Sequence, residues 1–204
     1  ADDAHLRSLC RRLVRSCVLD CGRRARFAFG NGGKGSNQAI GAARLGARCK
    51  LLAGVGADRF GDEAVQLWRA EGVDCSAVRQ MVGTPTMAGI IILDAAGENR
   101  IITDPGANAR LTGTDVETFA ATWTSPGILL TQLEIPVETA ARALAIGKAR
   151  GLTTILNPAP GRALPKEILA DVDIHDPGPE PGADWLAVSR TDKRRGIQGI
   201  ALQV

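Results

Sequence analysis

The chain has 204 residues, a hydrophobic content of 45% and a formal net charge of +3. This length is sufficient for one sizeable core, with or without a small subdomain, and the composition is that of an ordinary globular protein. Aromatic residues make up only 3% of the chain and the basic residues form no stripe between them, which argues against a nucleic-acid partner.

Apolar runs and cysteines limit the location of the protein. No apolar run approaches the ~20 residues of a membrane span, so we expect no membrane partner. An odd number of cysteines without C-x-x-C spacing suits neither a disulfide framework nor a zinc site, which favours a reducing cytoplasm and no metal ligands. The five are Cys10, Cys17, Cys21, Cys49 and Cys75.

Residues 1–24 differ in composition from the rest of the chain. Six arginines surround three of the cysteines, and Leu6, Leu9 and Leu13 are spaced so that they would share one side of a helix. This pattern predicts a basic amphipathic helix on the surface.

A glycine-rich stretch, residues 30–38 (GNGGKGSNQ), follows. Glycine tolerates tight turns and close approach to a ligand, and the small apolar run 39–46 has helical spacing and ends in glycine. We therefore expect the glycines to open a helix. Its unpaired N–H groups, with the side chains of Lys34 and Asn37, would suit an anion or several hydroxyl groups.

Several interpretations of these glycines are open. A nucleotide P-loop fails, because Ala28 and Gly35 occupy positions that need glycine and Ser/Thr. The dinucleotide fingerprint G-x-G-x-x-G is present at Gly30, Gly32 and Gly35, but a good preceding strand and an acidic ribose partner are lacking. A tight turn without a ligand is the structural alternative.

Strands and helices then alternate, which predicts an α/β fold with parallel strands. Strands are expected over 49–55, 127–133 and 152–156, and helices over about 60–70, 114–122 and 136–150. Asp58 and either Thr112 or Thr114 are expected to cap two of the helices. The segments 87–93 and 100–103 flank a polar turn and predict a β-hairpin.

Glu134 follows the strand predicted at 127–133. Ligands of parallel α/β sheets bind beyond the carboxyl ends of the strands, so Glu134 and the glycine turn are expected to share one crevice. A sugar needs a carboxylate acceptor beside amide and ammonium donors, and Glu134, Asn37 and Lys34 supply that set. Alternatively, Glu134 is simply a carboxylate favoured at a helix start.

The alternation is lost after residue 175. Prolines and glycines between 177 and 182 predict a loop, and residues 197–204 are too few to complete a domain.

Residues 32–39 (GGKGSNQA) resemble the sugar-binding signature of the ribokinases, within the phosphofructokinase B family of carbohydrate kinases. Five further blocks match in the same order, and the resemblance extends from about residue 22 to about residue 173. These blocks are 55–62 (VGADRFGD), 97–100 (GENR), 105–109 (PGANA), 132–136 (QLEIP) and 156–160 (LNPAP).

The resemblance implies a three-layer α/β/α, Rossmann-like sheet with a small β lid, in truncated form. It divides the chain into a divergent segment 1–24, a ribokinase-like domain 25–175 with its lid at about 86–103, and a divergent tail 176–204. It implies ATP-dependent phosphorylation of ribose or a related pentose, with Mg²⁺, by a homodimer formed through the lid. The implied sugar-binding residues are Gly33, Lys34, Gly35, Ser36, Asn37 and Glu134.

Other features of the ribokinases are not found in this sequence. The N-terminal strand with its Asn-x-Asp is absent, which suggests an altered or out-of-frame N-terminus, and Gly178 and Pro179 stand where an Asn-x-x-Glu region is expected. No catalytic base is assigned, because Gly182-Ala183-Asp184 only partly matches the family's Gly-Ala-Gly-Asp. We therefore expect weak sugar binding and little or no kinase activity.

Three alternatives are kept. The chain could be a non-catalytic module for sugar binding or dimerisation. It could be a dinucleotide-dependent oxidoreductase, on the strength of the glycine fingerprint. A sheet without its last strands could also fail to fold stably.

Overall fold

A computed structural model describes residues 29–93, 99–123, 126–175 and 198–202. Contacts divide the chain into residues 1–30 and residues 31–204, and the second unit is described below. The surface helix expected within 1–24 and the loop expected at 177–182 lie outside the described residues. The division of the chain at residues 24 and 175 therefore stays a prediction.

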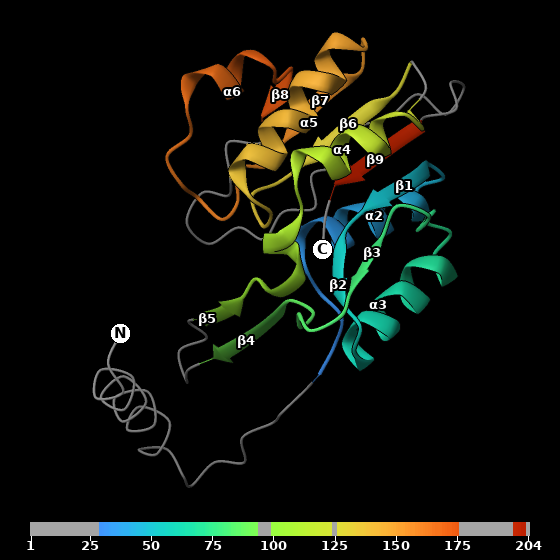
Figure 1. The fold of residues 1–204 in the computed structure, drawn as a ribbon, viewed down its shortest axis with the longest axis vertical. Helices are drawn as coiled ribbons and strands as arrows, with labels where there is room; N and C mark the ends of the chain where they lie inside the picture. Colours follow the sequence, from blue (N-terminus) through green and yellow to red (C-terminus); the bar gives the residue numbers. More distant parts are fainter. Residues whose placement is uncertain (1–28, 94–98, 124–125, 176–197, 203–204) are drawn as a thin grey trace, which may run out of the picture. The chain divides into compact units, whose positions relative to one another are not determined.

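A parallel sheet forms the centre of the second unit (Figure 1). Over the described residues it has five strands in the order β1-β9-β6-β7-β8, and each of these pairings is parallel. The carboxyl ends of the strands therefore share one edge. The strands are β1 (Arg48–Leu52), β6 (Ile128–Thr131), β7 (Thr153–Leu156), β8 (Ile174–His175) and β9 (Gln198–Leu202).

Helices cover both faces of this sheet. Neighbouring side chains of a strand point to opposite faces, and in β1 Leu51 and Leu52 belong to different buried clusters. Leu51 shares its cluster with Trp68 of α3, whereas Leu52 shares its cluster with Phe119 of α4. The predicted three-layer α/β/α fold is confirmed. The helices are α2 (Lys34–Arg44), α3 (Arg59–Ala70), α4 (Gly113–Ala120), α5 (Val137–Ala149) and α6 (Lys166–Ala170).

The helix boundaries follow local signals in the sequence. Gly33 precedes α2 with a φ of 96°, a left-handed conformation that glycine adopts without a steric penalty. Asp58 caps α3 by accepting a hydrogen bond from the Gly61 N–H at 2.9 Å. Thr112 caps α4 in a capping box with Asp115. These expected helix starts are confirmed, although α2 begins before the apolar run.

The segment predicted as one strand over 49–55 consists of two strands in different sheets. After β1 ends, β2 (Gly54–Gly56) pairs with β3 (Arg79–Met81), a strand that the sequence did not indicate. Gly54 passes so close to the 3₁₀-helix η1 (Gly106–Arg110) that a Cβ would lie 2.6 Å from the Ala107 carbonyl oxygen. Apolarity alone did not reveal this break.

The predicted hairpin is present as β4 (Ala88–Leu93) and β5 (Asn99–Asp104). Among the described residues its two antiparallel strands pair only with each other. Ile90 lies opposite Ile102, and Ile91 lies opposite Ile101. Since adjacent residues point to opposite sides of a strand, the hairpin carries isoleucines on both faces.

Strand β9 comes from the C-terminal segment 197–204, which we expected to be too short to complete a domain. Residues 198–202 of this segment form the strand between β1 and β6 (Figure 1). They pair with backbone N–H and C=O groups that would otherwise be left unpaired on both neighbouring strands. Five residues are enough to pair with these two strands.

Candidate functional site

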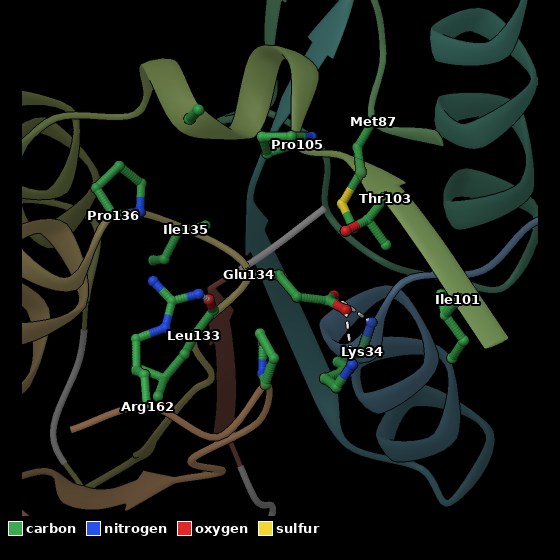
Figure 2. Close-up of a pocket in the computed structure, with 12 residues that line it drawn as sticks. Lys34, Met87, Ile101, Thr103, Pro105, Leu133, Glu134, Ile135, Pro136 and Arg162 are labelled. Atoms are coloured by element: carbon green, nitrogen blue, oxygen red, sulfur yellow. Dashed lines mark hydrogen bonds and ion pairs between the residues drawn. The ribbon is translucent and has the colours of Figure 1, made fainter. Parts of the chain in front are cut away.

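A cavity of about 490 Å³ lies where β6 and β7 end, and three parts of the chain line it (Figure 2). These are the start of α2, the hairpin with the turn after it, and the segments that follow β6 and β7. The lining residues are Lys34, Met87, Ile101, Thr103, Pro105, Ala109, Leu133, Glu134, Ile135, Pro136, Pro160 and Arg162.

Lys34 and Glu134 meet on the wall of this cavity. The backbone N–H of Lys34 donates to Glu134 Oε2 at 2.7 Å, and its Nζ donates to Oε1 at 2.8 Å. The Glu134 side chain is only 9% exposed, whereas that of Lys34 is 39% exposed. The structure thus joins the glycine turn and the residue after β6, as the rule for strand ends indicated.

Glu134 is held in place by the chain around it. Its backbone N–H donates to Oε1 of the buried Gln132 at 2.8 Å. The N–H of Leu133 donates to the Ala159 carbonyl at 3.0 Å, which fixes the segment after β7 beside it. A carboxylate oriented in this way can accept hydrogen bonds from Lys34 and from a ligand, because it offers about four lone-pair positions.

The other expected sugar-binding residues are placed in different ways. Gly33 is half-buried just before α2, and Gly35 is buried within its first turn. The hydroxyl of the buried Ser36 accepts a hydrogen bond from Trp68 Nε1 at 2.7 Å, so it joins α2 to α3. Asn37 is exposed on α2, and neither Ser36 nor Asn37 is among the residues that line the cavity.

Sequence reasoning missed much of the cavity wall. Met87, Ile101 and Thr103 reach it from the hairpin region, and Arg162 reaches it from the segment after β7 (Figure 2). The alternation of Ile101 and Thr103 along β5 could have indicated which face of the hairpin covers the cavity. Arg162 lies two residues beyond a block that carried the family resemblance.

The chain just before β4 and the chain just after β5 are both anchored by buried or half-buried polar groups. Asp58 accepts hydrogen bonds from the Thr86 N–H at 2.8 Å and the Thr86 hydroxyl at 2.7 Å. Burial raises the pKa of the Asp58 carboxyl, but hydrogen bonds from Thr86, Gly61 and Phe60 together hold that pKa below its usual value. The carboxylate is therefore charged at neutral pH while it holds the start of β4.

Asn108, in the 3₁₀-helix η1, links the chain after β5 to the core. It is fully buried, its amide nitrogen donates to Met87 Sδ at 3.2 Å, and its oxygen accepts from the Gly54 N–H at 3.4 Å. The nearby Ala107 N–H donates to the Pro85 carbonyl at 2.8 Å. Met87, a residue of the cavity wall, is thus tied to β2.

Comparison with known proteins decides the class of this chain. Residues 12–188 match the model for the pfkB family carbohydrate kinase. The chain belongs to the pfkB family of carbohydrate kinases. Among members of this family, the ribokinase of Staphylococcus aureus is 37% identical over 177 residues, covering 87% of this chain and 58% of that protein. The predicted resemblance to ribokinases is confirmed.

Solved pfkB-family structures agree with the fold. The ribokinase of Giardia lamblia aligns with a TM-score of 0.65 and 31% identity, over 75% of this chain and 48% of that one. The ribokinase of Arabidopsis thaliana, whose structure is complexed with ribose and ATP, aligns with a TM-score of 0.63 and 28% identity, over 76% and 52%. The chain thus spans about half the length of the relatives it matches.

The described part of this pfkB-family chain contains no group of three His, Cys, Asp or Glu residues able to hold a metal ion. None of its helices is long and apolar enough to cross a membrane.

Proposed function

We propose that the cavity binds ribose or a related pentose, as the sugar site of an ATP-dependent kinase acting on the 5-hydroxyl of ribose. The observation that carries this proposal is the Lys34–Glu134 pair on the cavity wall. A pentose presents neutral hydroxyls that donate and accept, and this pair offers a carboxylate acceptor beside an ammonium donor. The pentose-binding roles of Gly33, Gly35, Ser36 and Asn37 remain proposals.

The surroundings of the pair also suit a small polyol. Most of the lining is apolar, and a few oriented polar groups in an apolar pocket are typical of small-molecule sites. The face of the hairpin that carries Ile101 and Thr103 lies against the cavity and would limit the access of water to a bound sugar. Ribokinase relatives support ribose as the sugar to test first.

We expect the 204-residue chain to bind sugar weakly and to show little or no phosphoryl transfer. That reaction needs an orienting base, donors for the transferred phosphate and usually Mg²⁺ bridging the nucleotide phosphates. The Lys34–Glu134 pair supports the sugar-facing role of the cavity, and the described residues contain no group of three His, Cys, Asp or Glu residues able to hold a metal ion. ATP and Mg²⁺ are proposed as the cofactors of the reaction, on the basis of family membership.

Calorimetric titration with ribose and a coupled assay of ADP release test this proposal together. We expect heat of binding with ribose and at most slow ADP release. Robust turnover would contradict the expected inactivity, and absence of ribose binding would contradict the assignment of the cavity.

A second candidate is a non-catalytic module for sugar binding and dimerisation, and the hairpin favours it. Ile90 and Ile102 form the face opposite to the one that carries Ile101, and they are 61% and 47% exposed. Because a lone hairpin is marginal in water, a second copy of the chain would cover this face well. Thermal stabilisation by ribose without any effect of ATP would favour the module over the kinase.

The alternative of a dinucleotide-dependent oxidoreductase is not retained. The chain belongs to a family of carbohydrate kinases. In addition, the Lys34 N–H at the start of α2, where a pyrophosphate would bind, donates to the carboxylate of Glu134. A cytoplasmic location stays a prediction.

A further inference from the structure

Arg162 brings a second cation to the cavity wall, on the other side of Glu134 from Lys34 (Figure 2). Lys34 is neutralised, because its Nζ pairs with Glu134 at 2.8 Å. Arg162, in contrast, takes part in no ion pair within the described ranges of the chain. Of the charged groups that line the cavity, the guanidinium of Arg162 is the one without a counter-charge there.

The backbone holds this guanidinium at the cavity. Its Nη2 donates to the Leu133 carbonyl at 2.9 Å, one residue before Glu134. Leu133 in turn donates to Ala159, so the segment that carries Arg162 is tied to the chain at the end of β6. A guanidinium has five N–H donors in a fixed plane, and a single bond to Leu133 leaves the others for a ligand.

This arrangement exceeds what a neutral sugar needs. The Lys34–Glu134 pair already offers a donor and an acceptor to hydroxyl groups, whereas an uncompensated guanidinium is best matched by an anion. A phosphoryl group presents several charged oxygens with the spacing of the guanidinium fork. Ile135 and Pro160 lie on the same cavity wall, and Arg162 itself is exposed, so a ligand in the cavity can reach its guanidinium.

We propose that Arg162 forms an anion subsite that binds a phosphoryl group next to a pentose held at Glu134. The inference rests on the proposed function for the identity of the pentose. The phosphoryl group would come either from the phosphate monoester of a pentose 5-phosphate or from the terminal phosphate of a nucleotide. In either case Arg162 distinguishes phosphorylated from neutral ligands at this cavity.

The test compares ligands with and without a phosphate on the whole 204-residue chain. Wild type, Arg162→Gln and Arg162→Lys are titrated calorimetrically with ribose, with ribose 5-phosphate and with a non-hydrolysable ATP analogue. Arg59→Gln is the matched control, because Arg59 lies on α3, is 86% exposed and does not line the cavity. Circular dichroism melting shows whether each variant is folded.

We expect Arg162→Gln to weaken binding of ribose 5-phosphate by about 10- to 100-fold, the range for a charge-assisted hydrogen bond. Binding of ribose should change less than about threefold, and Arg162→Lys should retain part of the affinity because it keeps the charge but not the fork. If only the ATP analogue loses affinity, the nucleotide is the source of the phosphoryl group. Arg59→Gln should behave as wild type.

Several results would overturn one proposal without the other. If wild type binds ribose 5-phosphate no better than ribose and Arg162→Gln affects neither phosphorylated ligand, the anion subsite is refuted and the pentose site stands. Equal weakening of all three ligands by Arg162→Gln also refutes the subsite, since the residue would then only shape the cavity. If ribose 5-phosphate binds in an Arg162-dependent way but ribose does not bind, the subsite stands and the proposed substrate is refuted. Binding of none of the three refutes both.

Discussion

Lys34 and Glu134 are 100 residues apart in the chain, and two hydrogen bonds join them. One carboxylate therefore satisfies both the first backbone N–H of α2 and the ammonium group of Lys34. The helix N-terminus and the lysine are both positive, so a single negative charge stabilises the two together. The residue expected to recognise a sugar also fixes the start of a helix.

Replacing Glu134 by Gln tests this double role. The amide keeps the shape of the side chain but loses the charge, so we expect ribose affinity to fall by about 10-fold or more. Calorimetry with ribose measures the loss. Glu138→Gln is the matched control, because Glu138 is exposed in the first turn of α5 and does not line the cavity. Unchanged affinity in Glu134→Gln would refute the assigned role.

Replacing Asn108 by Ala tests the anchor of the hairpin. The change leaves the buried Gly54 N–H without its acceptor and frees Met87, so we expect a loss of about 1–3 kcal/mol in the free energy of unfolding. Urea denaturation measures this loss, and ribose binding should weaken because Met87 lines the cavity. Asn31→Ala, at an exposed position before α2, should leave both quantities unchanged.

Replacing Ile102 by Glu tests the proposed dimer. A charge on the outer face of the hairpin would have to be desolvated in the interface, so we expect the variant to be monomeric at concentrations where wild type is dimeric. Size-exclusion chromatography with light scattering measures the mass. Val82→Glu serves as control, since Val82 is 90% exposed and lies outside the hairpin. A monomeric wild type, or a dimeric Ile102→Glu, would contradict the proposal.

Asp173 gives stability a defined dependence on pH. Hydrogen bonds from the Lys148 ammonium, and then from the Thr154 N–H and hydroxyl, lower the pKa of its carboxyl to about 2. The unfolded value is about 3.9. Because the folded value is lower, this stabilisation is fully present above the unfolded pKa and is lost as the pH falls through about 2.

The replacement Asp173→Asn should therefore destabilise the protein at pH 6 and have progressively less effect between about pH 4 and pH 2. Urea titrations at a series of pH values measure the difference from wild type. Glu167→Gln, on the exposed side of α6, should show no such trend. A difference between Asp173→Asn and wild type that stays constant down to pH 2 would exclude the carboxylate as its cause.

Local chemistry explains which parts of the fold the sequence could predict. Asp58 and Thr112 cap their helices through contacts within three residues, so their roles are readable from the sequence itself. The proximity of Lys34 to Glu134 was predictable for a different reason, because parallel strands deliver their carboxyl ends to one edge.

Long-range packing explains what the sequence did not reveal. Ser36 stands inside the glycine signature, yet its hydroxyl bonds to Trp68, a partner 32 residues away on another helix. Arg162 carries no local sign that its guanidinium contacts the chain after β6. In both cases the direction of the side chain depends on elements that are remote in sequence.

The position of β9 has a consequence for the order in which the molecule forms. The two strands that flank it are made from residues 48–52 and 128–131, long before residues 198–202 emerge from the ribosome. Until then, β1 and β6 have open edges that can pair with other chains. Completion of the sheet is therefore a high-contact-order step that must wait for residues 198–202, and nascent chains are most exposed to aggregation in the interval before it.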